Sequence, residues 1–139
     1  MDMKHIHDLK DLFVEQLKEQ YSGERQQLEA LAKLREKTST RALQQSIDFH
    51  LGRTRQQMQR LEEVFSLLGR NLHGEENVGV KGLIAEAFEL AERCTGDKVR
   101  DAGIITSIQH LNHHNIASYG TLCAYARELG LDEVKLQLG

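Results

Sequence analysis

The 139-residue sequence contains no proline and few aromatic residues, and runs of β-branched side chains are rare in it. Leu, Gln, Glu, Lys and Arg are abundant instead. These straight side chains lose little rotamer freedom in a helix, so the composition predicts an all-α protein. The length suits a single domain over residues 1–139, long enough to bury one core but too short to divide into two.

Cysteine is also scarce, because Cys94 and Cys123 are too few for the disulfide framework of a secreted protein. No apolar run approaches the length of a membrane-spanning helix, and no charged-then-apolar leader precedes the first amphipathic segment. The formal charge of −3 is modest and mixed along the chain, whereas nucleic-acid binding requires an extended basic face. We therefore expect a soluble cytoplasmic protein that binds neither membranes nor nucleic acid.

Apolar residues recur at spacings of three and four in four segments, the pattern of amphipathic helices. The first segment covers about residues 5–35, and the second follows an N-cap at Ser39 or Thr40 and ends at Gly69. The turn-rich stretch GRNLHGEENVG leads to a shorter helix over about 78–93. The last helix follows the TGD break at 95–97 and ends with Gly130 as its C-cap. The pattern predicts three long helices and one short one.

Three long helices leave an open groove in an antiparallel bundle, whose usual closed form has four. The segment LDEVKLQLG offers Asp132 as the cap of a further helix that has barely begun. We expect either that the sequence is truncated relative to the natural protein or that another chain fills the groove. Large exposed apolar patches are rare on monomers, so we predict a homodimer, with an unknown protein partner as the alternative.

Each long helix has a polar interruption near its middle. In the first, helical phase puts Glu24 on the apolar face, where an ionised carboxylate needs a partner or a cation. The other interruptions are His50, Arg53, Thr54 and Gln57 in the second helix, and Asn112 and Asn115 with His113 alongside in the last. A layer of this kind holds two iron or manganese ions in some bundles, or fixes helix register through hydrogen bonds in others. The lack of a Glu-x-x-His motif near these positions favours the hydrogen-bonded layer.

Three histidines, His110, His113 and His114, have spacings that place them on roughly one side of a helix. They could bind zinc or nickel, but the further ligands that such a site needs are not evident. We expect a solvated face with His113 as the inward member.

Three other residues have both a structural and a functional interpretation. Cys94 and Cys123 belong to no Cys-x-x-Cys motif, so we interpret them as buried small hydrophobic residues rather than a thiol pair. Tyr119 is in phase with the apolar stripe and is either a core aromatic residue with its hydroxyl at the edge or a hydrogen-bonding member of the polar layer.

Four stretches carry a resemblance that spans nearly the whole chain: DLFVEQLKEQYSGERQQL at 11–28, HLGRTRQQMQRLEEVFSLLG at 50–69, GVKGLIAEAFEL at 79–90 and IASYGTLCAYARELGLDE at 116–133. With these, the sequence resembles the ferritin-like bacterial family typified by YciE and YciF, whose function is unknown. The resemblance implies a ferritin-like antiparallel bundle, usually paired as a homodimer, with stress-response associations and an inferred metal site.

The metal ligands that the resemblance implies are poorly retained. Glu24 and His113 match the family pattern, but the usual His-Leu-Glu-Glu-Thr segment is HLGRT here, with Gly52 and Arg53 in place of acids. Lys81 replaces a glutamate, and Asn112 and Asn115 stand where acids are expected; the acidic final helix of the family is absent from the sequence. These changes remove the anionic oxygens that replace the hydration of a hard cation.

We therefore expect a non-enzymatic protein without a cofactor, in which side chains supply the charge once supplied by metal. The residual metal candidates are Glu24, His50 and His113, and the predicted belt consists of Glu24, Arg53, Gln57, Lys81, Asn112 and Asn115. In this belt we predict a direct or water-bridged contact between Glu24 and Arg53, with Lys81 within reach. The alternative is a functional di-iron or di-manganese protein, for iron handling or oxidation, that recruits Glu86, Glu89 or the acids of a partner chain.

Overall fold

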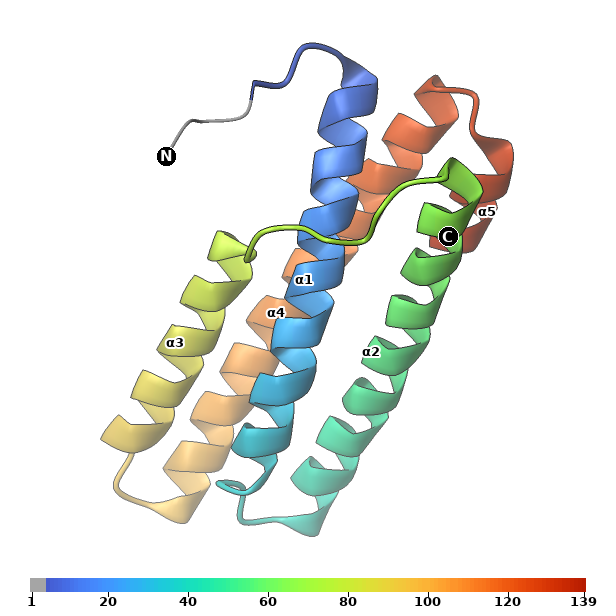
Figure 1. Cartoon of the computed structure of the whole chain (residues 1–139). Helices are drawn as coiled ribbons and strands as arrows, with labels where there is room; N and C mark the ends of the chain where they lie inside the picture. The colour runs from blue at the N-terminus through green and yellow to red at the C-terminus, as the bar shows by residue number, and fades with distance from the viewer. Residues whose placement is uncertain (1–4) are drawn as a thin grey trace.

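The computed structural model describes residues 5–139, which fold into helices without a strand in that range. The helices are α1 (Leu9–Arg35), α2 (Arg41–Leu68), α3 (Val78–Arg93), α4 (Asp97–Glu128) and α5 (Asp132–Leu138). Successive helices run in opposite directions (Figure 1). The all-α prediction is confirmed, but the helix count was one too low, because residues 132–138 form a further short helix.

The helix ends follow the local chemistry of the sequence. Thr40, rather than Ser39, caps α2 by accepting a hydrogen bond from the backbone N–H of Leu43 at 3.2 Å. Gly69 ends the same helix with a φ of 63°, a left-handed conformation that glycine adopts without a Cβ penalty. The first helix begins later than predicted, since the side chain of Asp8 caps it from outside.

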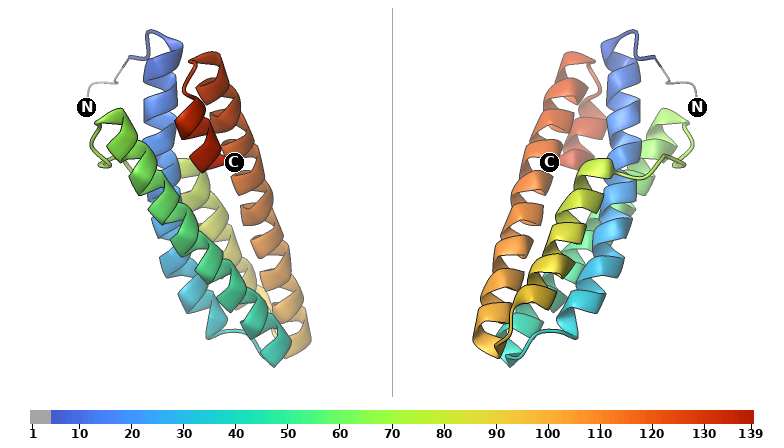
Figure 2. Two further views of the ribbon diagram at one scale, coloured as in Figure 1. Left: turned by 90° about the vertical axis from the view of Figure 1, so that its right-hand side faces the viewer. Right: turned by 90° about the vertical axis from the view of Figure 1, so that its left-hand side faces the viewer.

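Helix α1 packs against α2, α3 and α4. Helices α2 and α4 flank it, and α5 packs against both of them at one end of the bundle (Figure 2). The predicted groove between two long helices is therefore partly covered by α5. No helix in the range 5–139 is long and apolar enough to cross a membrane.

The core is divided along the bundle axis into two apolar clusters. The cluster near the α1–α2 turn includes Leu31, Ile47 and Leu111, and the cluster under α5 includes Phe13, Phe65 and Leu122. On every long helix, polar residues separate the two clusters. The candidate site lies at this division.

Candidate functional site

A layer of polar side chains crosses the bundle between the two apolar clusters. Its members, called the Glu24 layer below, are Gln20, Glu24 and Gln27 from α1, Gln57 from α2, and Asn115 and Tyr119 from α4. Glu24 and Gln27 have no exposed surface, and Gln20 is 3% exposed. As helical phase predicted, the Glu24 carboxylate is fully buried.

Side-chain amide groups contact the Glu24 carboxylate. Nε2 of Gln20 donates to Oε1 at 3.1 Å. With its amide nitrogen turned toward Glu24, Gln57 donates to Oε1 at 3.2 Å and to Oε2 at 3.1 Å. Burial raises the pKa of Glu24 to about 7, and the hydrogen bonds and the charge of Arg53 oppose this rise only in part. At neutral pH the carboxyl group is therefore close to its midpoint and needs no full countercharge.

A second pair of amides joins α1 to α4 beside Glu24. Nε2 of Gln27 donates to Oδ1 of Asn115 at 3.0 Å, and Nδ2 of Asn115 donates back to Oε1 of Gln27 at 2.9 Å. This reciprocal pair satisfies both buried amides, which would otherwise cost free energy in the core. It also fixes the axial register of α4 against α1.

Tyr119 is the least satisfied member of the layer. Its hydroxyl is buried but has no hydrogen-bond partner among the described residues. Burial and the neighbouring Glu24 carboxylate raise the pKa of this phenol, so it stays protonated at physiological pH. Buried hydroxyl groups are normally hydrogen-bonded, so a ligand, a water molecule or a change of conformation would satisfy this one.

The predicted direct contact between Glu24 and Arg53 is wrong. Arg53 is exposed, and no ion pair joins it to Glu24 in the described part of the chain. Gln57, one turn further along α2, occupies the position opposite Glu24. The Arg53 charge acts on Glu24 only through space, by lowering its pKa.

Two further members of the predicted sites lie elsewhere. Lys81 is exposed on α3 and pairs with Glu76 at 3.2 Å. It therefore lies outside the polar layer, contrary to the prediction. His113 is exposed, whereas His114 is half-buried and its Nδ1 has no partner among residues 5–139, which reverses the predicted assignment of the inward histidine. The reason is helical phase: Leu111 and Asn115 face the core, and His113 lies midway between them on the outer side.

The remaining predicted positions are spread over the surface and its edges. His110 is exposed, His50 and Asn112 are half-buried, and Cys94 and Cys123 are half-buried free thiols rather than fully buried residues. Burial and the adjacent Arg53 lower the pKa of His50, which favours its neutral form.

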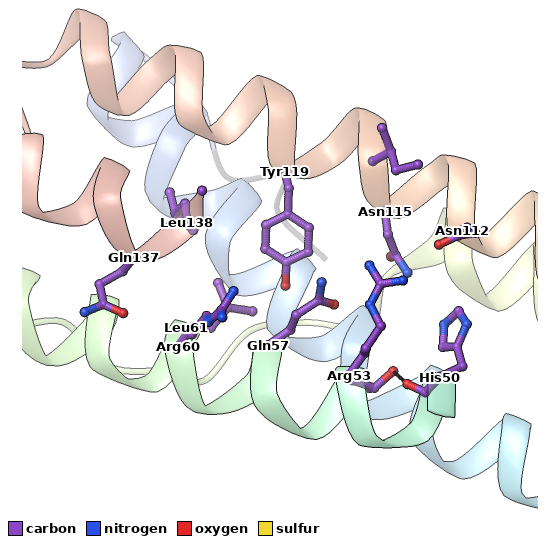
Figure 3. Close-up of a pocket in the computed structure, with 13 residues that line it drawn as sticks. His50, Arg53, Gln57, Arg60, Leu61, Asn112, Asn115, Tyr119, Gln137 and Leu138 are labelled. Carbon is purple, nitrogen blue, oxygen red and sulfur yellow. Dashed lines mark hydrogen bonds between the residues drawn. The ribbon is translucent and has the colours of Figure 1, made fainter. Parts of the chain in front are cut away.

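A cavity of about 190 Å³ lies between α2 and α4, next to the Glu24 layer. Figure 3 shows Tyr119 and Asn115 extending from α4 toward Gln57 and Arg53 of α2. The residues that line this α2–α4 cavity are His50, Arg53, Thr54, Gln57, Arg60, Leu61, Asn112, Asn115, Ile116, Tyr119, Gln137, Leu138 and Gly139. Glu24 does not line it, since Gln57 and Tyr119 stand between the carboxylate and the cavity.

Comparison with known proteins places the chain in a family. Residues 8–139 match the family described as "Domain of unknown function (DUF892)". The chain belongs to this family. It is 40% identical to Protein YciF of Escherichia coli K12 over 131 residues, which are 94% of this chain and 77% of YciF. The predicted resemblance is thereby confirmed.

Two solved structures agree closely with this fold. YcfI of Rhodopseudomonas palustris, provisionally described as a structural protein, superposes with a TM-score of 0.94 at 37% identity, covering 99% of this chain and 88% of its own. The crystal structure of the Escherichia coli stress protein YciF gives a TM-score of 0.90 at 36% identity, covering 96% and 84%. The whole bundle, not one motif, is shared.

The residues of this DUF892 member do not fit a di-metal centre. Within residues 5–139 no group of three or more His, Cys, Asp or Glu side chains could hold a metal ion. Around Glu24 the neighbouring groups are amide N–H donors aimed at the carboxylate, whereas a hard cation requires several anionic oxygens. Glu86 and Glu89, which the alternative interpretation recruits, are exposed on α3 and are absent from the Glu24 layer.

Sequence reasoning missed two glutamines of the layer, Gln20 and Gln27. Both share the buried face of α1 with Glu24, since they stand four residues before and three after it. Their spacing was therefore a usable signal. The sequence held no such signal for the α2 residue that contacts Glu24, because that contact depends on how α1 and α2 are displaced along their axes.

Proposed function

We propose that this chain is a non-enzymatic, stress-associated member of the ferritin-like family, in which the Glu24 layer takes the place of a di-metal centre. The observation that carries the proposal is the set of amide donors on the Glu24 carboxylate, from Gln20 at 3.1 Å and from Gln57 at 3.2 and 3.1 Å. These donors satisfy a buried carboxyl group without a cation. The layer then serves stability and register, and the protein acts through binding in the cytoplasm.

The relatives support the same kind of role. YciF is described as a stress protein and YcfI provisionally as a structural protein. Neither description names a reaction. A structural or partner-binding role agrees with a core layer in which the amides and the Glu24 carboxylate are engaged with one another.

Metal analysis tests this proposal. The full chain, purified without chelator and then exposed to Fe²⁺ or Mn²⁺ and desalted, should retain well under one ion per chain. A Glu24→Gln variant, which keeps the size of the side chain and removes its charge, should give the same metal content. About two ions per chain, as di-metal bundles hold, with loss of those ions in Glu24→Gln, would establish the di-iron or di-manganese alternative.

We also infer that the chain forms a homodimer. Large apolar side chains are exposed on the helices that surround the α2–α4 cavity: Phe49 on α2 is 70% exposed, Ile116 on α4 60% and Leu136 on α5 83%. Exposed apolar surface of this kind favours burial against a second copy. Light scattering should give twice the mass of one chain at micromolar concentration; a mass equal to one chain would contradict the inference.

A further inference from the structure

The α2–α4 cavity has an unusual side-chain charge composition, because two arginines line it and no Asp or Glu side chain does. Arg53 and Arg60 stand seven residues apart on α2, about two turns, and so project from one face of the helix. Neither makes an ion pair with an acidic residue in the described range. Two unpaired guanidinium groups beside one hollow create a local positive potential.

The positive charge of both arginines reaches the interior of the cavity. The charge of Arg60 acts on the buried phenol of Tyr119, whose pKa it partly lowers. The charge of Arg53 acts on His50, whose pKa it lowers further. The arginines are therefore electrostatically coupled to the walls of the cavity, and are not merely two charges on a distant surface.

The cavity also contains a free donor. Tyr119 lines the cavity, and its buried hydroxyl beside the cavity has no partner among the described residues. The amides of Asn112 and Gln57 and the half-buried ring of His50 provide further polar groups on the same walls.

We propose that the α2–α4 cavity binds a small oxyanion, held by the guanidinium groups of Arg53 and Arg60 and by the hydroxyl of Tyr119. Guanidinium groups match carboxylate and phosphoryl oxygens through paired hydrogen bonds, so these two ligand classes share the chemistry of the site. The volume of about 190 Å³ lies below the range of about 300–1,000 Å³ of pockets for drug-sized ligands, which favours a compact anion.

Nuclear magnetic resonance titration of the ¹⁵N-labelled full chain tests this proposal. Inorganic phosphate and acetate are added separately, with sodium chloride adjusted so that the ionic strength stays constant. We expect saturable shifts of the backbone amides around Arg53, Arg60 and Tyr119 and of the two arginine side-chain N–H groups. The anion that saturates at lower concentration identifies a phosphoryl or a carboxylate ligand.

Substitutions make the test specific. Arg53→Gln and Arg60→Gln should each weaken binding by about tenfold or more, the effect of losing a charge-assisted hydrogen bond. Arg55→Gln is the matched control, since it removes the same charge from an exposed position of α2 outside the cavity. Tyr119→Phe should weaken binding about threefold or more without loss of fold, because its hydroxyl has no partner to lose.

Two results would overturn the proposal. One is shifts that rise linearly without saturation for both anions. The other is equal weakening by Arg53→Gln and Arg55→Gln, which would indicate a general effect of net charge. Circular dichroism of each variant establishes that it remains folded, so a loss of binding is not a loss of structure.

Discussion

Substitution of Glu24 by Gln should make the protein more stable at alkaline pH. The pKa of Glu24 is raised from 4.5 to about 7 by burial, so the folded state holds a proton that the unfolded chain releases. This contribution to stability is fully present below the unfolded pKa and is lost as the pH rises through the folded one. Between the unfolded and the folded pKa, each unit of pH lowers the free energy of unfolding by about 1.4 kcal/mol. The total loss above neutrality is about 3 kcal/mol.

Glutamine has the same shape as a protonated glutamate and does not titrate, so it removes this cost. Urea denaturation followed by circular dichroism should show Glu24→Gln more stable than the unmodified protein by about 3 kcal/mol at about pH 8.5, and nearly equal to it at about pH 4.5. Glu29→Gln, at an exposed position of α1, is the matched control and should leave the pH dependence unchanged. If Glu24→Gln lowered stability at alkaline pH, the carboxylate would be a stabilising anion and the reasoning would be refuted.

Three further outcomes follow from the same geometry. Gln27→Leu should destabilise the fold by about 2 kcal/mol in urea denaturation, because it leaves the Asn115 amide buried without a partner. Adding Asn115→Leu should recover part of that loss, and a double variant that recovers none of it would argue against the pairing. Arg53→Ala should change the free energy of unfolding by less than about 0.5 kcal/mol, because Arg53 is exposed and unpaired in the described chain. A loss of about 3 kcal/mol would instead indicate a buried ion pair between Arg53 and Glu24. Phe49→Ser, which removes a side chain that is 70% exposed, should shift light-scattering mass toward one chain, whereas an unchanged dimer would exclude Phe49 from the interface.

Features that depend on the local sequence were predictable. Thr40 caps α2 and Gly69 ends it, because a hydroxyl acceptor and a left-handed glycine act on their own backbone neighbours. The burial of Glu24 followed from its phase with Leu17 and Leu28 on one helix. In each case the deciding interaction lies within a few residues of the chain.

Features that depend on the displacement of one helix against another were not predictable. Arg53 and Gln57 share a face of α2, and which of them meets Glu24 depends on the axial register of α2 against α1. Lys81 was assigned to the layer by its place in the family pattern, but the outer side of α3 lets it reach Glu76 instead. His113 was assigned by its neighbour Asn112, although Leu111 and Asn115 together set the inner face of α4.

Division of the core by the Glu24 layer also explains how the helices align. The reciprocal pair of Gln27 and Asn115 forms in only one register of α4 against α1. A slip of one turn would leave both amides buried without partners, at a cost of about 1–3 kcal/mol for each. The layer therefore contributes structural specificity, as a polar residue does at the core of a coiled coil.

The most direct test of the central claim is a titration of the Glu24 side-chain carboxyl carbon by ¹³C nuclear magnetic resonance, repeated after addition of Mn²⁺. We predict a midpoint of about 7 and a Glu24 signal that Mn²⁺ neither shifts nor broadens, because amide donors satisfy the carboxylate. Loss of the Glu24 signal through paramagnetic broadening by Mn²⁺, reversed by a chelator, would contradict it and identify Glu24 as a metal ligand.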